Sequence, residues 1–515
     1  MKQPDAIELS LFAQRVNAVC DEMGAQLRHA AFSPNIRDRL DYSCALFDAE
    51  GALIAQAAHI PVHLGSMAYA MKSVVALFEW ASGDQVIFND PYLGGTHLPD
   101  VTLVAPVFIG GQLAAFVANR AHYADIGSIA PGSMPLTSVL EEEGVLLRPQ
   151  KLVVAGELDH EVMQVIVSAT RSPADTLGDI NAQMGCNIRG IARSEALIVS
   201  MGLEGFNTAV GTLNEYAEIL SLKMVKQLPA GCYTASDYME DDGQGNSNIP
   251  IQATMTVDTD CVEIDFTGTA DQVGGNINCP FSVTVAAVWY VLRSLMPRQT
   301  PACAGCFRPI RIQAPAGSLV NATFPAAVAA GNVETSSRIV DVMMRLLSQL
   351  IPERIPALSQ GTMNNFAFGA DVGEQAWGYY ETIGGGMGAG PGTDGLSAVQ
   401  SHMTNTRNTP VEVLEMRYPI RIGRYEIRTD SGGRGKRRGG DGIVREFVFT
   451  RPAVCTLLTE RRRLGTAGVQ GGSDGMSGRN WLDNRQLAAK CSFHVQAGER
   501  VIIETPGGGG WGSVI

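Results

Sequence analysis

The strongest constraint on the fold is a pair of apolar runs in residues 101–119, VTLVAPVFI and QLAAFVAN, which only Gly110-Gly111 separates. A glycine turn this short joins neighbouring antiparallel strands, so the pattern predicts a β-hairpin. In an antiparallel pair, the residues that begin one strand lie beside those that end the other. Polar side chains just before residue 101 are therefore expected close to polar side chains just after residue 119.

Side chains that commonly bind metals occupy those positions. His97 and Asp100 precede the first run with H-x-x-D spacing, and His122 and Asp125 follow the second run with the same spacing. Imidazole and carboxylate together suit Zn²⁺, Mn²⁺ or Fe²⁺. The hairpin therefore predicts that His97, Asp100 and His122 reach one divalent ion, and Asp41, at the start of an earlier strand, is expected to complete the site. The alternative needs no ion, because aspartate after Leu-Pro is a common strand cap and a buried histidine is usually just hydrogen-bonded.

The composition limits the partners. The formal net charge is −13, and an acidic chain repels phosphate backbones, so nucleic acid is not an expected partner. The first residues, MKQPDAIELS, lack the apolar region of a signal peptide, and proline or glycine interrupts the long uncharged stretches. The 10 cysteines are scattered without a regular framework. These features predict a reduced, cytoplasmic protein that does not enter a membrane.

The 515 residues are too many for one hydrophobic core and predict a multidomain chain of mixed α+β class. We expect a metal-binding catalytic domain over residues 1–228, a middle α/β domain over 229–405 and a β-rich C-terminal domain over 406–515. Apolar periodicity and turn residues define the expected elements. The helical segments are 7–30, 64–80, 174–228, 281–296 and 336–350, the further hairpins are 41–58 and 253–269, and the glycine turns are 432–442, 471–475 and 507–512.

Other motifs indicate less. No G-x-x-x-x-G-K-[ST] occurs, so the sequence predicts no nucleotide site, and no G-x-S-x-G announces a serine nucleophile. Gly390–Gly395 and Gly507–Gly512 match G-x-G-x-x-G without a strand-to-helix context, which favours turns. The lone Cys303-x-x-Cys306 favours two buried structural cysteines. The basic runs 434–438 and 459–463 are typical of solvated turns or subunit contacts, with anion binding as the alternative.

Longer motifs from about residue 8 to residue 512 resemble the hydantoinase B family. They are AAFSPNIRDRLDYSCALFD, HIPVHLGSM, FNDPYLGGTHLPDVTLV, AHYADIG, APGSMP, GDINAQ, GGNINCPFSVT, GNVETSSRI, DSGGRGKRRGGDGIVREF and TPGGGGWG. The family includes B subunits of N-methylhydantoinases and caprolactamase, part of 5-oxoprolinases, and subunits of acetone and acetophenone carboxylases. The chain departs from the family at Tyr123, where a second histidine is frequent, and at Cys303, where asparagine or a similar residue is frequent.

The resemblance implies a two-component, ATP-dependent enzyme in a hetero-oligomer. An A-type ATPase partner subunit would bind ATP and phosphorylate the oxygen of a small cyclic amide, and the B subunit would complete hydrolysis with water activated by its metal. The family's metal ligands correspond to Asp41, His97, Asp100 and His122, the same four residues that the spacing selects. Asp125 or His63 is expected to orient ligands or to carry a proton.

Two other functions remain open at this point. A subunit of an ATP-dependent ketone carboxylase would use the same metal site and would depend on bicarbonate. A non-catalytic scaffold for the ATPase partner would bind no metal, and the substitution His97→Ala would leave turnover of the complex intact. The length of the chain favours the cyclic-amide hydrolase, with a hydantoin, a lactam or an oxoproline as substrate.

Overall fold

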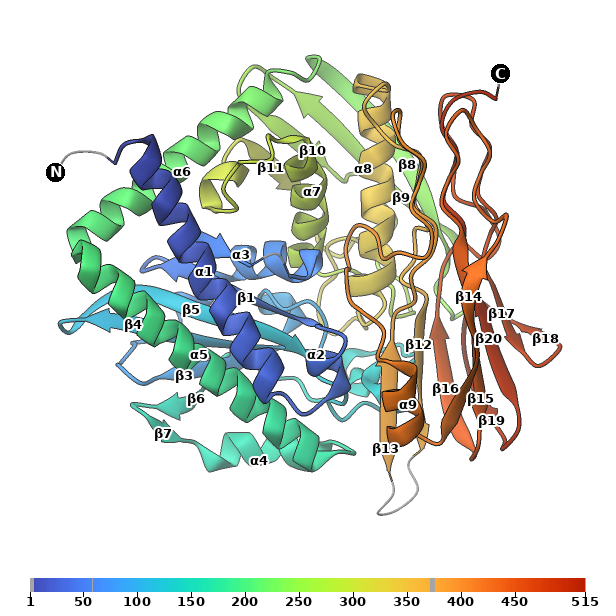
Figure 1. Ribbon diagram of the computed structural model, residues 1–515, viewed down its shortest axis with the longest axis horizontal. Coiled ribbons are helices and arrows are strands. Elements are labelled where there is room, and N and C mark those ends of the chain that lie inside the picture. The colour runs from blue at the N-terminus through green and yellow to red at the C-terminus, as the bar shows by residue number, and fades with distance from the viewer. Residues whose placement is uncertain (1–3, 58, 371–375, 515) are drawn as a thin grey trace.

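The computed structural model describes residues 4–57, 59–370 and 376–514. Its first large layer is an antiparallel sheet in the order β2-β1-β5-β4-β3-β6-β7 (Figure 1). The strands are β1 (Tyr42–Asp48), β2 (Leu53–Gln56), β3 (Gln85–Phe88), β4 (Asp100–Ile109), β5 (Gln112–His122), β6 (Gln150–Val154) and β7 (Glu157–Leu158). Strands β4 and β5 form the hairpin that the two apolar runs predict, and Asp100 pairs directly with His122.

Both faces of this sheet are covered, and the alternation of side chains explains how. On β1, Cys44 and Leu46 join the core that includes helix α1 (Ala6–Ala30), whereas Ala45 and Phe47 join the core that includes α3 (Pro61–Val75). Successive side chains of a strand point to opposite faces, so one strand serves both cores. Figure 1 shows α1 and α5 (Pro173–Met201) crossing the first of these faces side by side.

The helical segment predicted for 174–228 is two helices. Helix α5 ends at Met201, α6 (Leu203–Val225) begins two residues later, and Gly202 between them has a φ of 71°. That left-handed conformation suits glycine and stops the first helix. Within the described ranges no single helix is long and apolar enough to cross a membrane, although α5 and α6 pass that test together despite a bend of 100°.

The middle of the chain adds helices and a second sheet in the order β11-β10-β9-β8. Helix α3 packs against α7 so closely that a Cβ on Gly65 would lie 2.5 Å from the Cα of Ala286. Helix α8 in turn lies beside β8 and β9 (Figure 1). The bounds are β8 (Gly231–Asp241), β9 (Ser247–Val257), β10 (Val262–Asp265), β11 (Ile310–Gln313), α7 (Phe281–Leu295) and α8 (Ser336–Leu350).

The strand-rich C-terminal part is a sandwich of two sheets, β13-β12-β16-β19 and β14-β15-β20-β17-β18. Aromatic rings interdigitate between them, and the ring centres of Phe368 and Phe447 are 5.5 Å apart. The bounds are β12 (Asn365–Ala370), β13 (Trp377–Glu381), β14 (Ile420–Arg428), β15 (Gly442–Phe449), β16 (Ala453–Leu458), β17 (Arg479–Leu482), β18 (Arg485–Leu487), β19 (Lys490–Val495) and β20 (Arg500–Glu504). Shorter α-helices of the described chain are α2 (Pro34–Arg37), α4 (His160–Ala169) and α9 (Val411–Arg417).

The predicted glycine turns pack on one another at one end of this sandwich. The backbone N–H of Gly508 donates to the carbonyl of Gly440 at 2.9 Å, and that of Gly433 donates to the carbonyl of Gly508 at 2.8 Å. A Cβ on Gly508 would lie 2.1 Å from the carbonyl oxygen of Met387, so no side chain fits there. The run 507–512 therefore forms a backbone-to-backbone contact between loops, as the turn prediction required.

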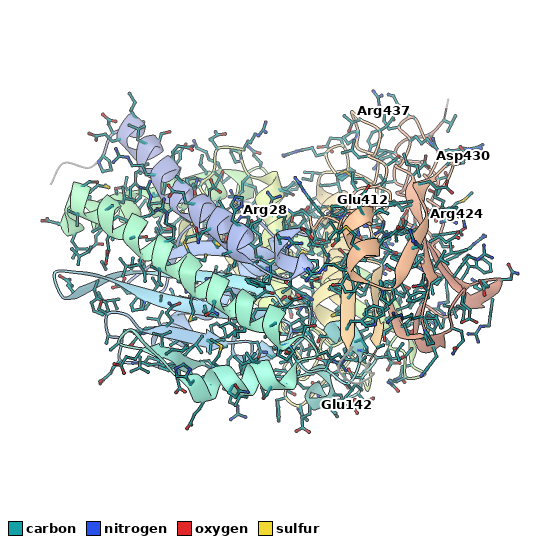
Figure 2. All side chains as sticks on the ribbon, turned by 60° about the horizontal axis from the view of Figure 1, so that its bottom comes forward. Arg28, Glu142, Glu412, Arg424, Asp430 and Arg437 are labelled. Carbon is teal, nitrogen blue, oxygen red and sulfur yellow. The ribbon has the colours of Figure 1, made fainter. Side chains whose placement is uncertain are left out.

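Thr459, Glu460 and Arg461 of the basic run 459–463 are buried, which corrects the prediction of a solvated turn or subunit contact for that part of the run, whereas Arg463 at its end is exposed. Arg461 is buried and its Nη2 lies 2.8 Å from Asp237 Oδ2, while Glu460 lies 3.1 Å from Nη2 of Arg338. The other basic run, 434–438, exposes its Arg434 and Arg438 at the loop end where Figure 2 labels Arg437.

One apolar core contains residues from both the first and the middle predicted domain, and the boundaries near 228 and 405 stay a prediction.

Candidate metal centre

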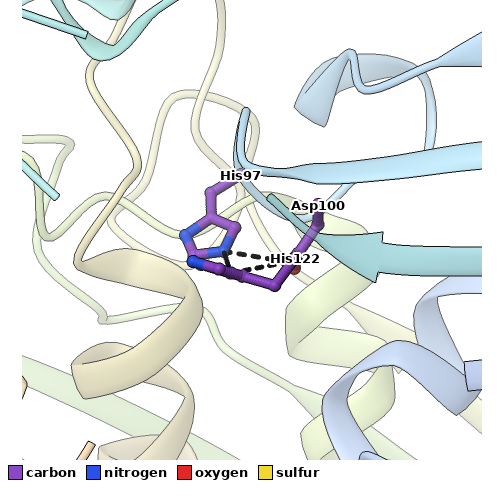
Figure 3. A group of neighbouring side chains, drawn as sticks. All are labelled: His97, Asp100 and His122. Carbon is purple, nitrogen blue, oxygen red and sulfur yellow. Dashed lines mark hydrogen bonds and ion pairs between the residues drawn. The ribbon is translucent and has the colours of Figure 1, made fainter. Parts of the chain in front are cut away.

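His97, Asp100 and His122 converge at the paired ends of β4 and β5 (Figure 3). His97 Nε2 lies 3.2 Å from His122 Nδ1 and 3.2 Å from Asp100 Oδ1, and His122 Nδ1 lies 3.0 Å from the same oxygen. All three side chains are buried. Atoms that bind one ion at about 2.0–2.2 Å stand roughly 3 Å apart, so this triangle has the dimensions of a metal ligand set.

The local sequence explains the convergence. Asp100 and His122 face each other through strand register, while His97 lies in the loop that the Gly94-Gly95 pair opens. Gly94 has a φ of 97°, and a Cβ on Gly95 would lie 2.5 Å from the carbonyl oxygen of Asn89. The loop therefore needs both glycines in order to fold back over the strand end.

The protonation of His97 supports a cation at this point. Its Nδ1 lies 3.2 Å from the carbonyl oxygen of Ala329, which can only accept, so Nδ1 carries the proton and the neutral ring presents a lone pair on Nε2. That lone pair faces the carboxylate of Asp100, and two acceptors at 3.2 Å need a cation between them. A second proton on His97 or a metal ion would serve, and the donor set of two imidazoles and a carboxylate suits a divalent metal.

The charges of the group agree with this arrangement. Burial alone would raise the pKa of the Asp100 carboxyl, but His97 and His63 hold that pKa well below its usual value. Burial lowers the pKa of His122, and Asp100 opposes that shift without reversing it. Burial also acts to lower the pKa of His97, but the attraction of the Asp100 carboxylate outweighs burial, so that the pKa of His97 is raised. An ionised carboxylate beside a neutral His122 is the state that a metal ion requires of its ligands.

The second oxygen of Asp100 is held by a separate set of donors. His63 Nε2 lies 3.1 Å from Oδ2, Asn332 Nδ2 lies 3.3 Å away, and the Thr96 hydroxyl also donates to this atom. His63 Nδ1 lies 3.3 Å from the hydroxyl of Ser43 on β1. His63 is therefore placed to fix the orientation of Asp100, which leaves Oδ1 directed at the two histidines.

Asp41 and Asp125 occupy different positions. Asp41 lines the same small cavity as His97, Asp100 and His122, but its Oδ2 lies 3.6 Å from Arg39 Nη2. It does not belong to the group of side chains whose ligand atoms lie together. Its role as a fourth ligand stays a prediction. Asp125 Oδ1 accepts from Gly127 N at 2.9 Å and from Ser133 Oγ at 3.0 Å, the contacts of a loop anchor, and its catalytic role also stays a prediction.

Two further residues of the centre come from distant parts of the chain. The ring of Tyr380, on β13, stacks on His122 with ring centres 5.0 Å apart. Asn332, in the short helical turn Gly331–Thr335, contacts Asp100. Hairpin spacing could not find either residue, because both lie more than two hundred positions further along. The segment GNVETSSRI, which contains Asn332, carried part of the family resemblance and was the available signal.

Fold and site together define a protein of mixed α and β layers with a buried His-Asp-His centre at a hairpin end. The sequence model of the Hydantoinase B/oxoprolinase family matches residues 5–514, and the chain belongs to this family. It is 40% identical to 5-oxoprolinase 1 of Arabidopsis thaliana over 99% of this chain and 42% of that protein. It is 32% identical to a putative B subunit of a D-/L-hydantoinase from a Pseudomonas species over 100% of this chain and 91% of that protein.

The chain spans about two fifths of the curated 5-oxoprolinases that it matches, between 40% and 42% of their length. Among solved structures, the ATP-dependent caprolactamase of Pseudomonas jessenii superposes with a TM-score of 0.93 at 28% identity, covering 99% of this chain and 92% of that one. A nucleotide-free acetone carboxylase superposes with a TM-score of 0.86 at 17% identity, covering 98% of this chain and 75% of that one. This similarity shows the fold alone. The predicted family and the predicted multidomain α+β class with a strand-rich C-terminal part are confirmed.

Proposed function

We propose that this chain is the B-type subunit of a two-component, ATP-dependent cyclic-amide hydrolase. An A-type ATPase subunit would phosphorylate the amide oxygen of a hydantoin, a lactam or an oxoproline, and this chain would hold a divalent metal that supplies activated water for ring opening. The convergence of His97, Asp100 and His122 on one point carries the proposal. The names of two relatives, a 5-oxoprolinase and a putative hydantoinase component, support the substrate class.

Each residue of the centre would have a distinct task. His97, Asp100 and His122 would hold the ion, and Asp41 would turn from Arg39 to complete its ligands. Zn²⁺, Mn²⁺ or Fe²⁺ bound there supplies a Lewis acid that lowers the pKa of water towards neutrality. His63 keeps Asp100 in place through its contact of 3.1 Å with Oδ2. Asp125 stabilises the loop that follows β5 through its bonds to Gly127 and Ser133.

We assign the phosphorylation step to the partner, since the sequence contains no G-x-x-x-x-G-K-[ST] motif. An amide is a poor electrophile, since resonance occupies its carbonyl carbon. Transfer of a phosphoryl group to the oxygen makes that oxygen a far better leaving group. Attack by one water on the activated carbon then breaks the C–N bond, which opens the ring, protonates the nitrogen as an amine and leaves an acyl phosphate. A second water hydrolyses that acyl phosphate, and phosphate leaves with the former amide oxygen.

The test combines metal analysis with turnover. The purified chain and the variants His97→Ala, His122→Ala and His160→Ala are analysed for bound Zn, Mn and Fe, then mixed with the ATPase subunit, ATP and candidate cyclic amides. His160 is exposed at the start of α4 and serves as the matched control. We expect both site variants to lose metal and turnover and the control to keep both.

The same assay separates the competing functions. Dependence of turnover on bicarbonate, with a carboxylated product, would favour the ketone carboxylase. Full turnover by a metal-free His97→Ala complex would favour a scaffold role. Hydrolysis of a cyclic amide by the isolated chain without ATP would contradict the division of labour between the two subunits.

A further inference from the structure

The orientation of His97 depends on a segment far from its own hairpin. The ring donates from Nδ1 to the carbonyl oxygen of Ala329 at 3.2 Å. The partner of this second nitrogen matters to a metal ligand, because it fixes the tautomer and the direction of the nitrogen that binds the ion. Any group that fixes the Ala329 carbonyl therefore also fixes His97.

A buried carboxylate holds the backbone beside that carbonyl. Glu143 Oε1 accepts from the backbone N–H of Ala329 at 2.8 Å, from that of Val328 at 2.9 Å and from the hydroxyl of Thr137 at 3.1 Å. The side chain is fully buried, and Oε2 has no hydrogen-bond partner among the residues that the structure describes. A buried carboxyl is costly unless it is hydrogen-bonded, so the contacts of Oε1 are what the protein gains from Glu143.

The loop that carries Glu143 also contacts this segment at a second place. The backbone N–H of Leu140 donates to the carbonyl of Pro325 at 3.1 Å. Val139 forms an antiparallel bridge with Ala326. The loop therefore runs along the segment from its beginning, and this double attachment brings Glu143 to the peptides next to the carbonyl that contacts His97.

The residues that follow Ala329 have a different support. The carbonyl of Asn276 accepts from the backbone N–H of Ala330 at 2.9 Å and from that of Gly331 at 3.1 Å. The helical turn that begins there carries Asn332, whose amide contacts Asp100 at 3.3 Å. The contact to Asp100 is thus held independently of the carboxylate, and loss of the carboxylate should act on the metal centre through His97.

We infer that Glu143 is a positioning residue of the metal centre, which holds the Ala329 carbonyl so that His97 directs Nε2 at the ion. Glu143 contacts neither the ion nor the substrate. It acts through the reach of Oε1 to two backbone N–H groups, and its charge is not required. The inference rests on the proposed function, in which His97 is a metal ligand.

Two conservative variants separate reach from charge. Glu143→Gln keeps the length and an acceptor oxygen but loses the charge, whereas Glu143→Asp keeps the charge and is shorter by one methylene group. Competition with a chromophoric chelator measures the Zn²⁺ affinity of the purified full-length chain. We expect Glu143→Asp to lower this affinity by about 10–100-fold, the usual effect of losing a group that orients a ligand, and Glu143→Gln to stay within about threefold of wild type.

Two further variants serve as controls. Glu141→Asp shortens an exposed carboxylate in the same turn. Asp84→Asn changes a buried carboxylate that accepts from the backbone N–H of Ala81 at 2.8 Å and from that of Ala155 at 2.9 Å, contacts that lead to no metal ligand. Both should bind Zn²⁺ as the wild type does, even where the urea midpoint of Asp84→Asn falls.

A spectroscopic measurement separates positioning from a general loss of stability. The chain has 8 histidines, and ¹⁵N labelling of histidine alone reports their ring nitrogens by NMR. The signal of His97 is the one that disappears in His97→Ala. In the metal-free wild type and in Glu143→Gln, the proton on its Nδ1 should exchange slowly with water. In Glu143→Asp this proton should exchange rapidly, while histidines outside the metal centre keep their signals.

Zn²⁺ affinity equal to wild type in Glu143→Asp would overturn the inference. An equal loss in Glu143→Gln would also overturn it, because charge would then be the cause, and so would an equal loss in Asp84→Asn or an unchanged His97 signal in Glu143→Asp. Loss of Zn²⁺ in His97→Ala with unaffected binding in Glu143→Asp would retain the proposed function and reject only this inference. Unchanged Zn²⁺ affinity in His97→Ala would reject both.

Discussion

The ring of Tyr380 stacks on His122, with ring centres 5.0 Å apart and 26° between the planes. The hydroxyl of the same tyrosine donates to Asn365 Oδ1 at 2.8 Å, and Asn365 Nδ2 donates to Glu334 Oε1 at 2.7 Å. Strand β13 of the C-terminal sandwich therefore reaches into a centre that the N-terminal hairpin builds. Stability of the sandwich and metal binding are expected to be linked through this contact.

Tyr380 should matter for its ring more than for its hydroxyl. Tyr380→Phe keeps the stacking on His122 and loses only the bond to Asn365, so metal affinity should change by less than about tenfold. Tyr380→Leu removes the stacking surface and should lower metal affinity by about 10–100-fold, the usual effect of removing a group that orients a ligand. Competition with a chromophoric chelator measures both. Equal losses in the two variants would contradict the role of the ring.

His63 is expected to position Asp100 and not to carry protons. His63→Ala should weaken metal binding by about 10–100-fold, because Asp100 Oδ2 loses its contact of 3.1 Å. Turnover of the assembled enzyme should then recover when metal is added in excess. His63→Gln, which retains a donor, should show a smaller loss. Turnover that stays low at saturating metal, with a changed pH profile, would instead indicate proton transfer by the ring.

Asp41 should prove to be a ligand although it contacts Arg39 in the structure. We expect Asp41 to leave Arg39 and bind the ion. The substitution Asp41→Asn should therefore lower the metal affinity by at least about tenfold. Asp38→Asn is the matched control, since Asp38 belongs to the same segment and pairs with Arg37 at 3.0 Å. Metal affinity equal to wild type in Asp41→Asn would restrict the ligand set to His97, Asp100 and His122.

The hairpin explains why part of the centre could be predicted from sequence. Strand register is a local property, so Gly110-Gly111 and two apolar runs are enough to place Asp100 opposite His122. The same reasoning could not supply the carbonyl of Ala329 that fixes His97, or the ring of Tyr380. Those contacts depend on how distant segments pack, which no periodicity in the sequence encodes.

The basic run 459–463 illustrates the opposite failure. Its composition favoured a solvated surface, because isolated arginines rarely become buried. Asp237 on β8 and Asp341 on α8 supply the compensating charges, and Arg461 lies within hydrogen-bond distance of both. Burial of a charge is a property of its partners, and the sequence around Arg461 does not reveal them.

Glu334 should make the stability of the protein depend on pH. Burial raises the pKa of its carboxyl from 4.5 to about 7, so the folded chain binds a proton that the unfolded chain releases. The unfolded state therefore gains relative stability as pH rises from about 4.5 to 7. Glu334→Gln removes this effect. Its free energy of unfolding should exceed that of the wild type by up to about 3 kcal/mol at pH 8 and should differ little at pH 4.5.

Urea midpoints at several pH values measure this difference. Glu353→Gln changes an exposed carboxylate near the end of the same helical region and should show no such trend. A gain for Glu334→Gln that is constant across the pH range would contradict a buried titrating carboxyl.

The sandwich should depend on the buried pair Arg445–Glu381. Arg445 Nε lies 2.6 Å from Glu381 Oε1, and both side chains are 0% exposed. Glu381→Gln leaves the guanidinium without its counter-charge and should cost about 3–5 kcal/mol, whereas replacing both residues with methionine should cost much less. Glu426→Gln breaks the exposed pair with Arg424 and should have almost no effect, because solvent screens that pair. Tyr380, which stacks on His122, directly precedes Glu381 on β13, so Glu381→Gln should also weaken metal binding. Unchanged metal affinity in this destabilised variant would contradict the link between the sandwich and the metal centre.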